Sequence, residues 1–289
     1  MTAATRQAAP VRRPVLDGSG VGWLFLPPAL LLVAGLGTPL FMTVWVAIRD
    51  NGVTGAVTGP VHDQLFVDSL GKTFLLALEV TALTWVVGIV FTLAVGLARP
   101  VVGRLLLGVL FLTFWISLLV RTYGWVLTLQ PNGALDTLMR DIGITSTGLG
   151  LYQTTPGLLP PMVHIMLPYM VLPLYSALTA LDPARIRAAR SLGGSEWMVL
   201  RRVVLPSLRS GSMAGIVLVF ILSLGFYVTP AFLGGPTDQL LSIVIGTQFG
   251  RLESIGLTAA MGALLLVAVL ALYFVADRFF RISDQWDRA

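Results

Sequence analysis

Six apolar runs, each long enough to cross a lipid bilayer, constrain this chain more than any other feature. They cover about residues 21–48, 73–97, 105–129, 158–178, 211–233 and 256–275. An α-helix needs about 20 apolar residues to cross the hydrocarbon core, where every backbone hydrogen bond must be made within the protein. Only 11% of the residues are charged, whereas soluble domains have about a quarter. The sequence therefore predicts an all-α integral membrane protein with six transmembrane helices and short connections.

The polar segments divide the chain into three predicted regions. Residues 1–19 are expected to be a disordered N-terminus, 20–280 a six-span domain, and 281–289 a short tail. The first apolar run is too long for a signal-peptide core and is expected to remain as a span, bent at its prolines. Between the spans, the sequence predicts a short helix at about 135–142 and an amphipathic, partly re-entrant loop at 234–254.

The distribution of basic residues predicts the orientation in the membrane. Six spans place both termini on one side, and fourteen of the 19 Lys and Arg residues fall on that side, against five on the other. Loops rich in Lys and Arg stay in the cytoplasm. Both termini and the loop between the fourth and fifth spans are therefore predicted to be cytoplasmic.

That loop, residues 181–210, is the most polar insert between two spans. Its sequence from residue 181 to residue 206 is LDPARIRAARSLGGSEWMVLRRVVLP. Residues 184–192 favour a helix, Gly193-Gly194 allows a sharp bend, and Ser195 is an N-cap for a second helix with Glu196 in its first turn. We expect a helix, a turn and a helix at the membrane face. On charge alone, its arginines are equally typical of a surface lying against anionic headgroups.

The loop resembles the cytoplasmic coupling loop of ATP-binding-cassette (ABC) importer permeases. In that pattern Glu-Ala-Ala precedes a glycine and Leu-Pro closes the loop; here Arg187 stands in place of the glutamate and Leu200 in place of a phenylalanine. The resemblance implies that the loop docks on a cytoplasmic ATPase and transmits its motion. The residues that it assigns to this role are Arg187, Ala188, Ala189, Leu192, Gly193, Gly194, Leu200, Leu205 and Pro206.

Three further segments, 120–133, 168–175 and 224–236, resemble permeases of the polyamine-importing type, so that the similarity covers about residues 70–280. It implies a bacterial inner-membrane importer of a small organic solute of the polyamine-like class. Its expected partners are a second homologous permease, two ATPase subunits and an extracytoplasmic substrate-binding protein. ATP and Mg²⁺ would be bound by the ATPase subunits, and this chain itself is expected to hold no cofactor.

The candidate residues of a translocation path are Glu79, Arg121, Tyr123, Phe226, Tyr227 and Pro230. A charge inside a span is costly and should face protein or water, so Glu79 is either a carboxylate that meets a cationic substrate or a hydrogen-bonded packing residue. Arg121 either contributes to an outer gate or extends to the interface. His164 has no second ligand at metal spacing and is expected to be a packing residue.

Enzymatic motifs are missing from the sequence. Gly71-Lys72-Thr73 resembles the end of a phosphate-binding loop, but the first glycine of that pattern would fall at Phe66 and no strand precedes it. The chain is therefore predicted to be a permease without its own ATPase site. The alternatives are an ion-coupled secondary transporter, which would need intramembrane acid or histidine relays, and a membrane scaffold that recruits a cytoplasmic partner without transport.

Overall fold

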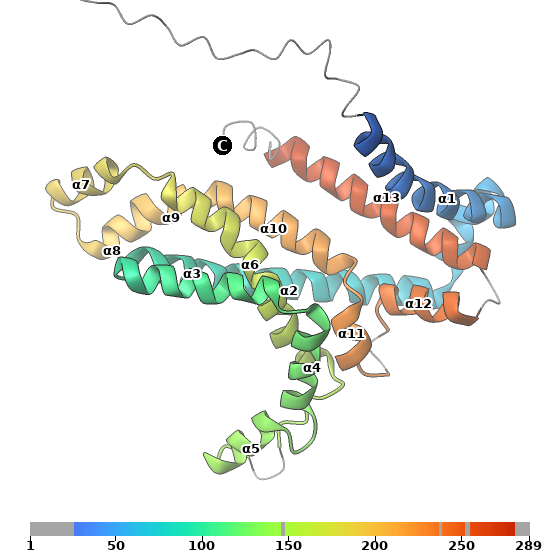
Figure 1. The fold of residues 1–289 in the computed structure, drawn as a ribbon, viewed down its shortest axis with the longest axis horizontal. Coiled ribbons are helices and arrows are strands. Elements are labelled where there is room, and N and C mark those ends of the chain that lie inside the picture. The colour runs from blue at the N-terminus through green and yellow to red at the C-terminus, as the bar shows by residue number, and fades with distance from the viewer. Residues whose placement is uncertain (1–25, 146–147, 237–238, 252–254, 281–289) are drawn as a thin grey trace, which may run out of the picture.

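The computed structural model describes residues 26–145, 148–236, 239–251 and 255–280, and every regular element in these ranges is a helix (Figure 1). Four helices are long and apolar enough to cross a membrane, or up to six if each of two bent helix pairs counts as one span. The predicted all-α membrane fold is confirmed. The terminal regions predicted at 1–19 and 281–289 lie outside the described residues.

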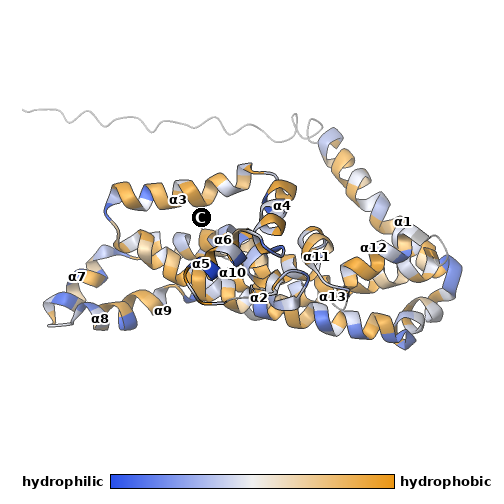
Figure 2. Ribbon diagram, turned by 90° about the horizontal axis from the view of Figure 1, so that it is seen from below, coloured by the Kyte–Doolittle hydropathy of each residue, from blue (hydrophilic) through white to orange (hydrophobic). Residues whose placement is uncertain are grey.

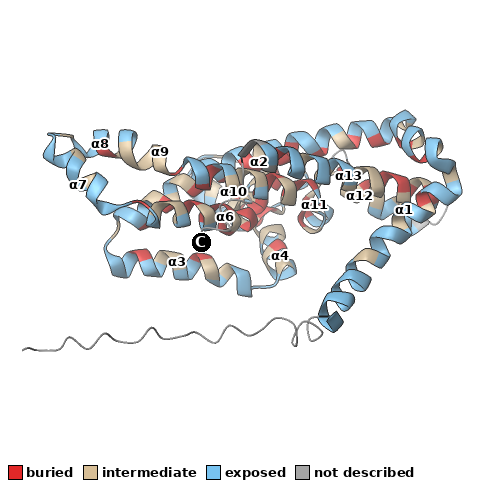
Figure 3. Cartoon of the chain, turned by 90° about the horizontal axis from the view of Figure 1, so that it is seen from above, coloured by how far each residue is buried: buried red, intermediate tan, exposed pale blue. Residues whose placement is uncertain are grey.

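The core forms where helix α2 (Gln64–Leu97) packs against α6 (Thr155–Thr179) and α10 (Arg209–Leu224). Met170 and Leu174 of α6 are fully buried between these helices, and Figure 3 shows the buried residues concentrated there. Glycines allow the close approach: a Cβ on Gly211 would lie 2.4 Å from the Pro173 carbonyl oxygen, and one on Gly215 would lie 2.5 Å from the Met170 sulfur. Helices α6 and α10 therefore pack closely at this glycine pair.

Helix α1 (Leu26–His62) and helix α13 (Ile255–Phe280) lie along each other outside this core (Figure 1). Helix α1 extends well beyond the predicted first span, and its non-helical backbone lies at Gly52, where φ is +70°. Most of its apolar side chains are exposed. These two helices therefore present to their surroundings an apolar surface of the kind that lipid or another membrane subunit covers.

The third predicted span, 105–129, is wrong as a continuous helix. Helix α3 (Pro100–Trp115) ends before Ile116 and Ser117, and the chain turns by 103° into the segment that holds α4 (Leu118–Leu129) and α5 (Ala134–Asp141). The turn is set by tertiary packing, because α3 lies beside α2 whereas α4 packs on α11 (Val228–Leu233). The short helix predicted at 135–142 is confirmed as α5.

The fifth predicted span is interrupted near its end. Helix α10 stops at Leu224, Gly225 follows as its C-cap, and α11 begins at Val228, so the helix breaks at this glycine. Helix α12 (Leu241–Arg251) then occupies part of the segment expected to be an outer loop. It is tied to α2 because the Leu241 backbone N–H donates to Thr73 Oγ1 at 2.8 Å.

Candidate functional site

The loop between α6 and α10 folds into two short helices and a turn at one end of the molecule (Figure 1). Helix α7 (Pro183–Ser191) begins where the Asp182 carboxylate accepts the Ala184 N–H at 2.8 Å, with Pro183 in its first turn. Helix α8 (Glu196–Val199) begins where Ser195 Oγ accepts the Met198 N–H at 3.3 Å. The predicted helix, turn and N-cap at Ser195 are therefore all present.

The two glycines of the turn are required for different reasons. Gly193 has φ +81°, a left-handed conformation that side chains with a Cβ rarely adopt. Gly194 donates its N–H to the Ala189 carbonyl oxygen at 3.1 Å, and a Cβ on it would lie only 2.7 Å from that oxygen. The Ala188 carbonyl accepts from Leu192 N–H in the last turn of α7. The turn is thus closed by backbone hydrogen bonds that need this pair of glycines.

An ion pair joins the two helices across the turn. Arg190 Nη2 lies 2.9 Å from Glu196 Oε2, with both side chains more than half exposed. This pair was not predicted from the sequence, although opposite charges on either side of a glycine turn are a usable signal for it. Arg187, which replaces the glutamate of the family pattern, has an exposed side chain and forms no ion pair with the described residues. Its backbone carbonyl accepts the Ser191 hydroxyl at 3.1 Å.

Two large apolar side chains project from the tip of the loop. Leu192 is 89% exposed and Trp197 is 66% exposed, whereas Val199 in the same loop is buried. Figure 2 shows hydrophilic stretches on both α7 and α8. Tryptophan is among the residue types that most often anchor protein–protein interfaces, so the exposed Trp197 is a candidate contact for a partner protein.

The second helix of the loop continues into α10 through an unusual connection. Leu200–Val204 form a π-helix (η2), in which the Leu205 N–H donates to the Leu200 carbonyl, and Leu205–Ser207 form the short helix α9. Pro206 has no N–H to donate, so the backbone cannot form an uninterrupted series of helical hydrogen bonds at this residue. The segment Glu196–Ser207 is bent by 54° from α10. The loop is therefore connected to α10 through one defined bend.

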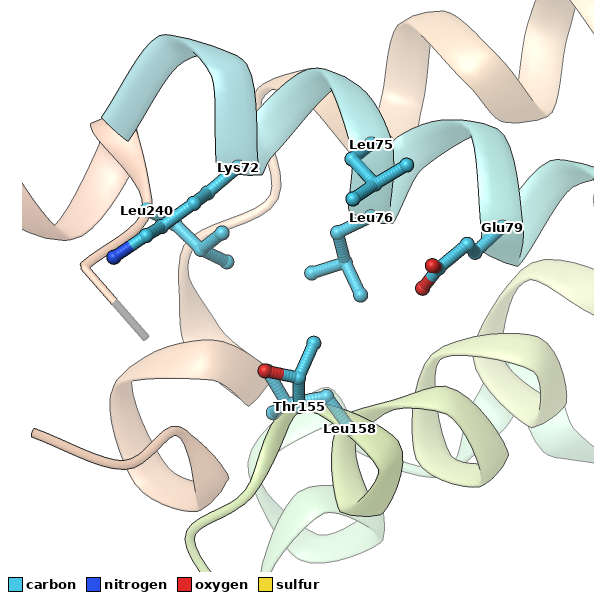
Figure 4. Close-up of a pocket in the computed structure, with 7 residues that line it drawn as sticks. All are labelled: Lys72, Leu75, Leu76, Glu79, Thr155, Leu158 and Leu240. Carbon is cyan, nitrogen blue, oxygen red and sulfur yellow. The ribbon is translucent and has the colours of Figure 1, made fainter. Parts of the chain in front are cut away.

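A separate small pocket lies between α2, the start of α6 and Leu240 (Figure 4). Its volume is about 140 Å³, and Glu79 and Lys72 line it from the same face of α2. The Lys72 amine points away from Glu79, whose carboxylate lies toward the middle of the pocket (Figure 4). Glu79 is half-buried and lies 18 residues before Leu97, which corresponds to about 27 Å along a helix. If the loop end of α2 lies at one membrane surface, Glu79 lies close to the other.

The remaining path candidates do not line this pocket. They gather where α4 meets α11 and α6: Thr122 and Thr229 are hydrogen-bonded at 3.2 Å beside Arg121 and Pro230 in sequence. Tyr123 of α4 is exposed, Phe226 packs partly against the core, and Tyr227 lies against Gly246 of α12. The predicted path residues therefore form two groups, Glu79 in the pocket and the other five around α4 and α11.

His164 has a structural partner that sequence analysis did not identify. The Trp125 indole N–H donates to His164 Nδ1 at 3.2 Å, which links α4 to α6. Within the described ranges, no group of three or more His, Asp or Glu side chains has an arrangement that could hold a metal ion. The histidine thus lies in a helix contact, where its ring accepts a hydrogen bond.

Comparison with known proteins places this geometry in a family. Residues 88–288 match the model of the binding-protein-dependent transport system inner membrane component. The chain belongs to this family. It is 32% identical over 261 residues to the spermidine/putrescine transport system permease protein PotB of Escherichia coli K12, covering 86% of this chain and 93% of that protein. A bacterial alginate ABC importer has the same fold, with a TM-score of 0.77 and 17% identity over 90% of this chain and 94% of the other.

A second structure of a bacterial alginate importer, in complex with an alginate pentasaccharide-bound periplasmic protein, matches with a TM-score of 0.74 and 17% identity, covering 90% of this chain and 93% of that chain. This chain is therefore a multi-pass inner-membrane permease subunit of a binding-protein-dependent ABC importer, in which ATPase activity resides in partner subunits. The family assignment favours this function over an ion-coupled transporter and over a scaffold. Permeases of this family work with ATPase and binding-protein partners.

Proposed function

We propose that this chain forms half of the translocation path for a polyamine-like cation, and that residues 181–210 couple it to an ATPase. The observation that carries the coupling role is the closed helical turn at Gly193, which presents Leu192 and Trp197 to a partner. The polyamine class is supported by the spermidine/putrescine permeases among its relatives. The assembly would contain a second homologous permease, two ATPase subunits and an extracytoplasmic binding protein.

The loop is built to move as one body. Capped helices, the glycine turn and the Arg190–Glu196 pair fix α7 against α8, so a force at the tip displaces both helices together. The displacement passes through the π-helix to α10, which is anchored by the buried Leu208 and packs closely on α6. ATP-driven closure of the ATPase dimer would thereby tilt α10 and α6 and change access to the path.

Glu79 would supply one carboxylate to a cationic substrate. Because the pocket of about 140 Å³ is smaller than the 300–1,000 Å³ of typical ligand sites, a second permease would have to complete the binding site. A protonated amine would bind at the Glu79 end, away from the Lys72 ammonium group at the other end of the pocket. A half-site on each permease suits an elongated cation with an amine at each end.

The loop and both termini are proposed to face the cytoplasm. Arg99 and Arg104 begin α3 at the same end of the molecule as the basic loop, which agrees with the positive-inside rule (Figure 1). Because the chain contains no cysteine, single substitutions can report orientation. A membrane-impermeant maleimide should label Thr137→Cys in intact cells and Ala188→Cys only after permeabilisation. The reverse pattern would contradict this orientation.

Uptake into proteoliposomes that contain the complete importer tests the substrate. ATP-dependent uptake of labelled spermidine is expected, and Glu79→Gln should reduce it about tenfold, since a hydrogen bond to a charged group contributes about 1.5–3 kcal/mol. Asp68→Asn is the matched control, because Asp68 is an exposed carboxylate of the same helix outside the pocket. Equal uptake by Glu79→Gln and wild type would exclude Glu79 from the path. ATP-dependent uptake of an anion but not of spermidine would overturn the proposed substrate class.

A further inference from the structure

A second hollow, here named the basal groove, lies at the base of the loop rather than at its tip. It has a volume of about 410 Å³ and opens between α7 on one side and the π-helix with α9 on the other. This volume is far above the roughly 10–15 Å³ that a single water molecule requires. The lining residues are Leu181, Arg185, Arg202, Val203, Pro206 and Ser207.

Two guanidinium groups give the basal groove its charge. Arg185 lies in the first turns of α7 and Arg202 lies in the π-helix, so one arginine comes from each wall. Within the described part of the chain, neither side chain forms an ion pair or a side-chain hydrogen bond, and the only acid paired with an arginine is Glu196 with Arg190. No acidic residue lines the groove. It therefore has the charge and the donors for a phosphate, which arginine binds in a bidentate manner.

The position of the basal groove relative to the membrane indicates the source of the phosphate. Leu181 follows the apolar helix α6 and is buried, and Pro206 and Ser207 lead directly into α10, so the groove lies where the chain leaves and re-enters the apolar spans. The tip at Leu192 is seven residues from Arg185, about 10 Å along a helix. A partner seated on the tip would leave the groove open at the level of lipid headgroups.

We propose that the basal groove binds the phosphate of an anionic phospholipid headgroup, with Arg185 and Arg202 as its two ligands. The apolar floor formed by Leu181, Val203 and Pro206 suits the glycerol backbone beneath the phosphate. A phosphate held by both walls would fix α7 against the π-helix at the point where the loop joins α10. The binding itself depends only on the groove and is independent of the substrate and the ATPase.

Lipid retention by the purified chain tests this site. The delipidated protein in detergent is titrated with dioleoyl phosphatidylglycerol or with dioleoyl phosphatidylcholine, and bound lipid is counted by native mass spectrometry. We expect one phosphatidylglycerol to be retained preferentially, and Arg185→Gln/Arg202→Gln to weaken its binding about thirtyfold, at about 1 kcal/mol for each arginine near anionic lipid. Arg187→Gln/Arg201→Gln is the matched control, because it removes the same charge from exposed positions of the same helices outside the groove.

Several outcomes would overturn the proposal. Equal retention of the two lipids, or an equal loss in the two double variants, would mean that the arginines act only through overall charge. Displacement of phosphatidylglycerol by millimolar inorganic phosphate would assign the groove to a free anion. Loss of the lipid on assembly with the ATPase subunits would show that protein, rather than lipid, occupies the groove. Size-exclusion profiles and unfolding temperatures like those of the wild type would confirm that the variants are folded.

Discussion

At the scale of single residues, Gly193 offers the sharpest test of the loop. No atom lies within 4 Å of a Cβ built on it, so a substitution acts through its backbone conformation alone. Left-handed backbone costs about 1–2 kcal/mol for a residue with a Cβ, and β-branched residues adopt it least readily, whereas Asn tolerates it. Gly193→Val should therefore distort the turn and Gly193→Asn should preserve it.

The expected result for Gly193→Val is continued ATP hydrolysis with uptake reduced about tenfold, since about 1.4 kcal/mol corresponds to a factor of ten. The measurement is the ratio of solute transported to ATP hydrolysed in proteoliposomes, with Gly193→Asn as the control. Membrane insertion should be unchanged, because the turn lies outside the apolar spans. Full uptake by the valine variant would remove the coupling role from this loop.

Local features were predictable from the sequence where one residue determines its own neighbourhood. Ser195 caps α8 and Gly193 supplies the left-handed turn, as expected from residue type alone. The Trp125–His164 hydrogen bond could not be predicted in this way, because it joins positions 39 residues apart on two helices. The separation of Glu79 from the other five path candidates could likewise not be predicted, because the sequence does not show which helix faces contact each other.

At the scale of helices, the crossing of α6 and α10 depends on the absence of one Cβ. At Gly211, a methyl group would lie 2.4 Å from the Pro173 carbonyl oxygen and 2.9 Å from Ala177 Cβ, so backbone would have to move. Overpacking of this kind costs about 1–3 kcal/mol. Gly211→Ala should lower the unfolding temperature in detergent, measured by thermal unfolding with size-exclusion detection.

Gly108→Ala is the control for that prediction, because Gly108 lies in helix α3 with open space around its Cβ position. Alanine there should leave the unfolding temperature unchanged or raise it, since alanine favours a helix over glycine by about 1 kcal/mol. A Gly211→Ala variant as stable as Gly108→Ala would show that α6 and α10 are not held in this close contact.

Helix boundaries were predictable where apolar runs and caps coincide, and the bend after α3 was not. The sequence between Trp115 and Leu118 is Ile-Ser, which contains neither Pro nor Gly and continues an apolar pattern. Its departure from a helix follows from the different partners of the two halves, because α3 packs on α2 whereas α4 packs on α11. Tertiary contacts of this kind override local helix propensity.

At the scale of the whole molecule, two exposed apolar surfaces have different proposed occupants. The outer sides of α1 and α3 expose many aliphatic side chains along their length, as expected for helices against lipid or a second permease (Figures 2 and 3). The tip of the loop exposes a small group of apolar side chains, Leu192, Trp197 and Met198, among basic residues. The proposed assembly therefore predicts that the ATPase can be removed without removing the second permease.

Affinity purification of the tagged chain in a mild detergent tests this separation. The wild-type chain should retain an ATPase and a second permease, identified by mass spectrometry. Leu192→Glu/Trp197→Glu should lose the ATPase and keep the permease. A few apolar side chains that become buried on binding supply most of the affinity of an interface, and burying a carboxylate there without a partner is costly. Leu112→Ala on the exposed side of α3 should leave ATPase binding unchanged. Retention of the ATPase by the tip variant would show that docking uses another surface, since the tip would then contribute nothing to that interface.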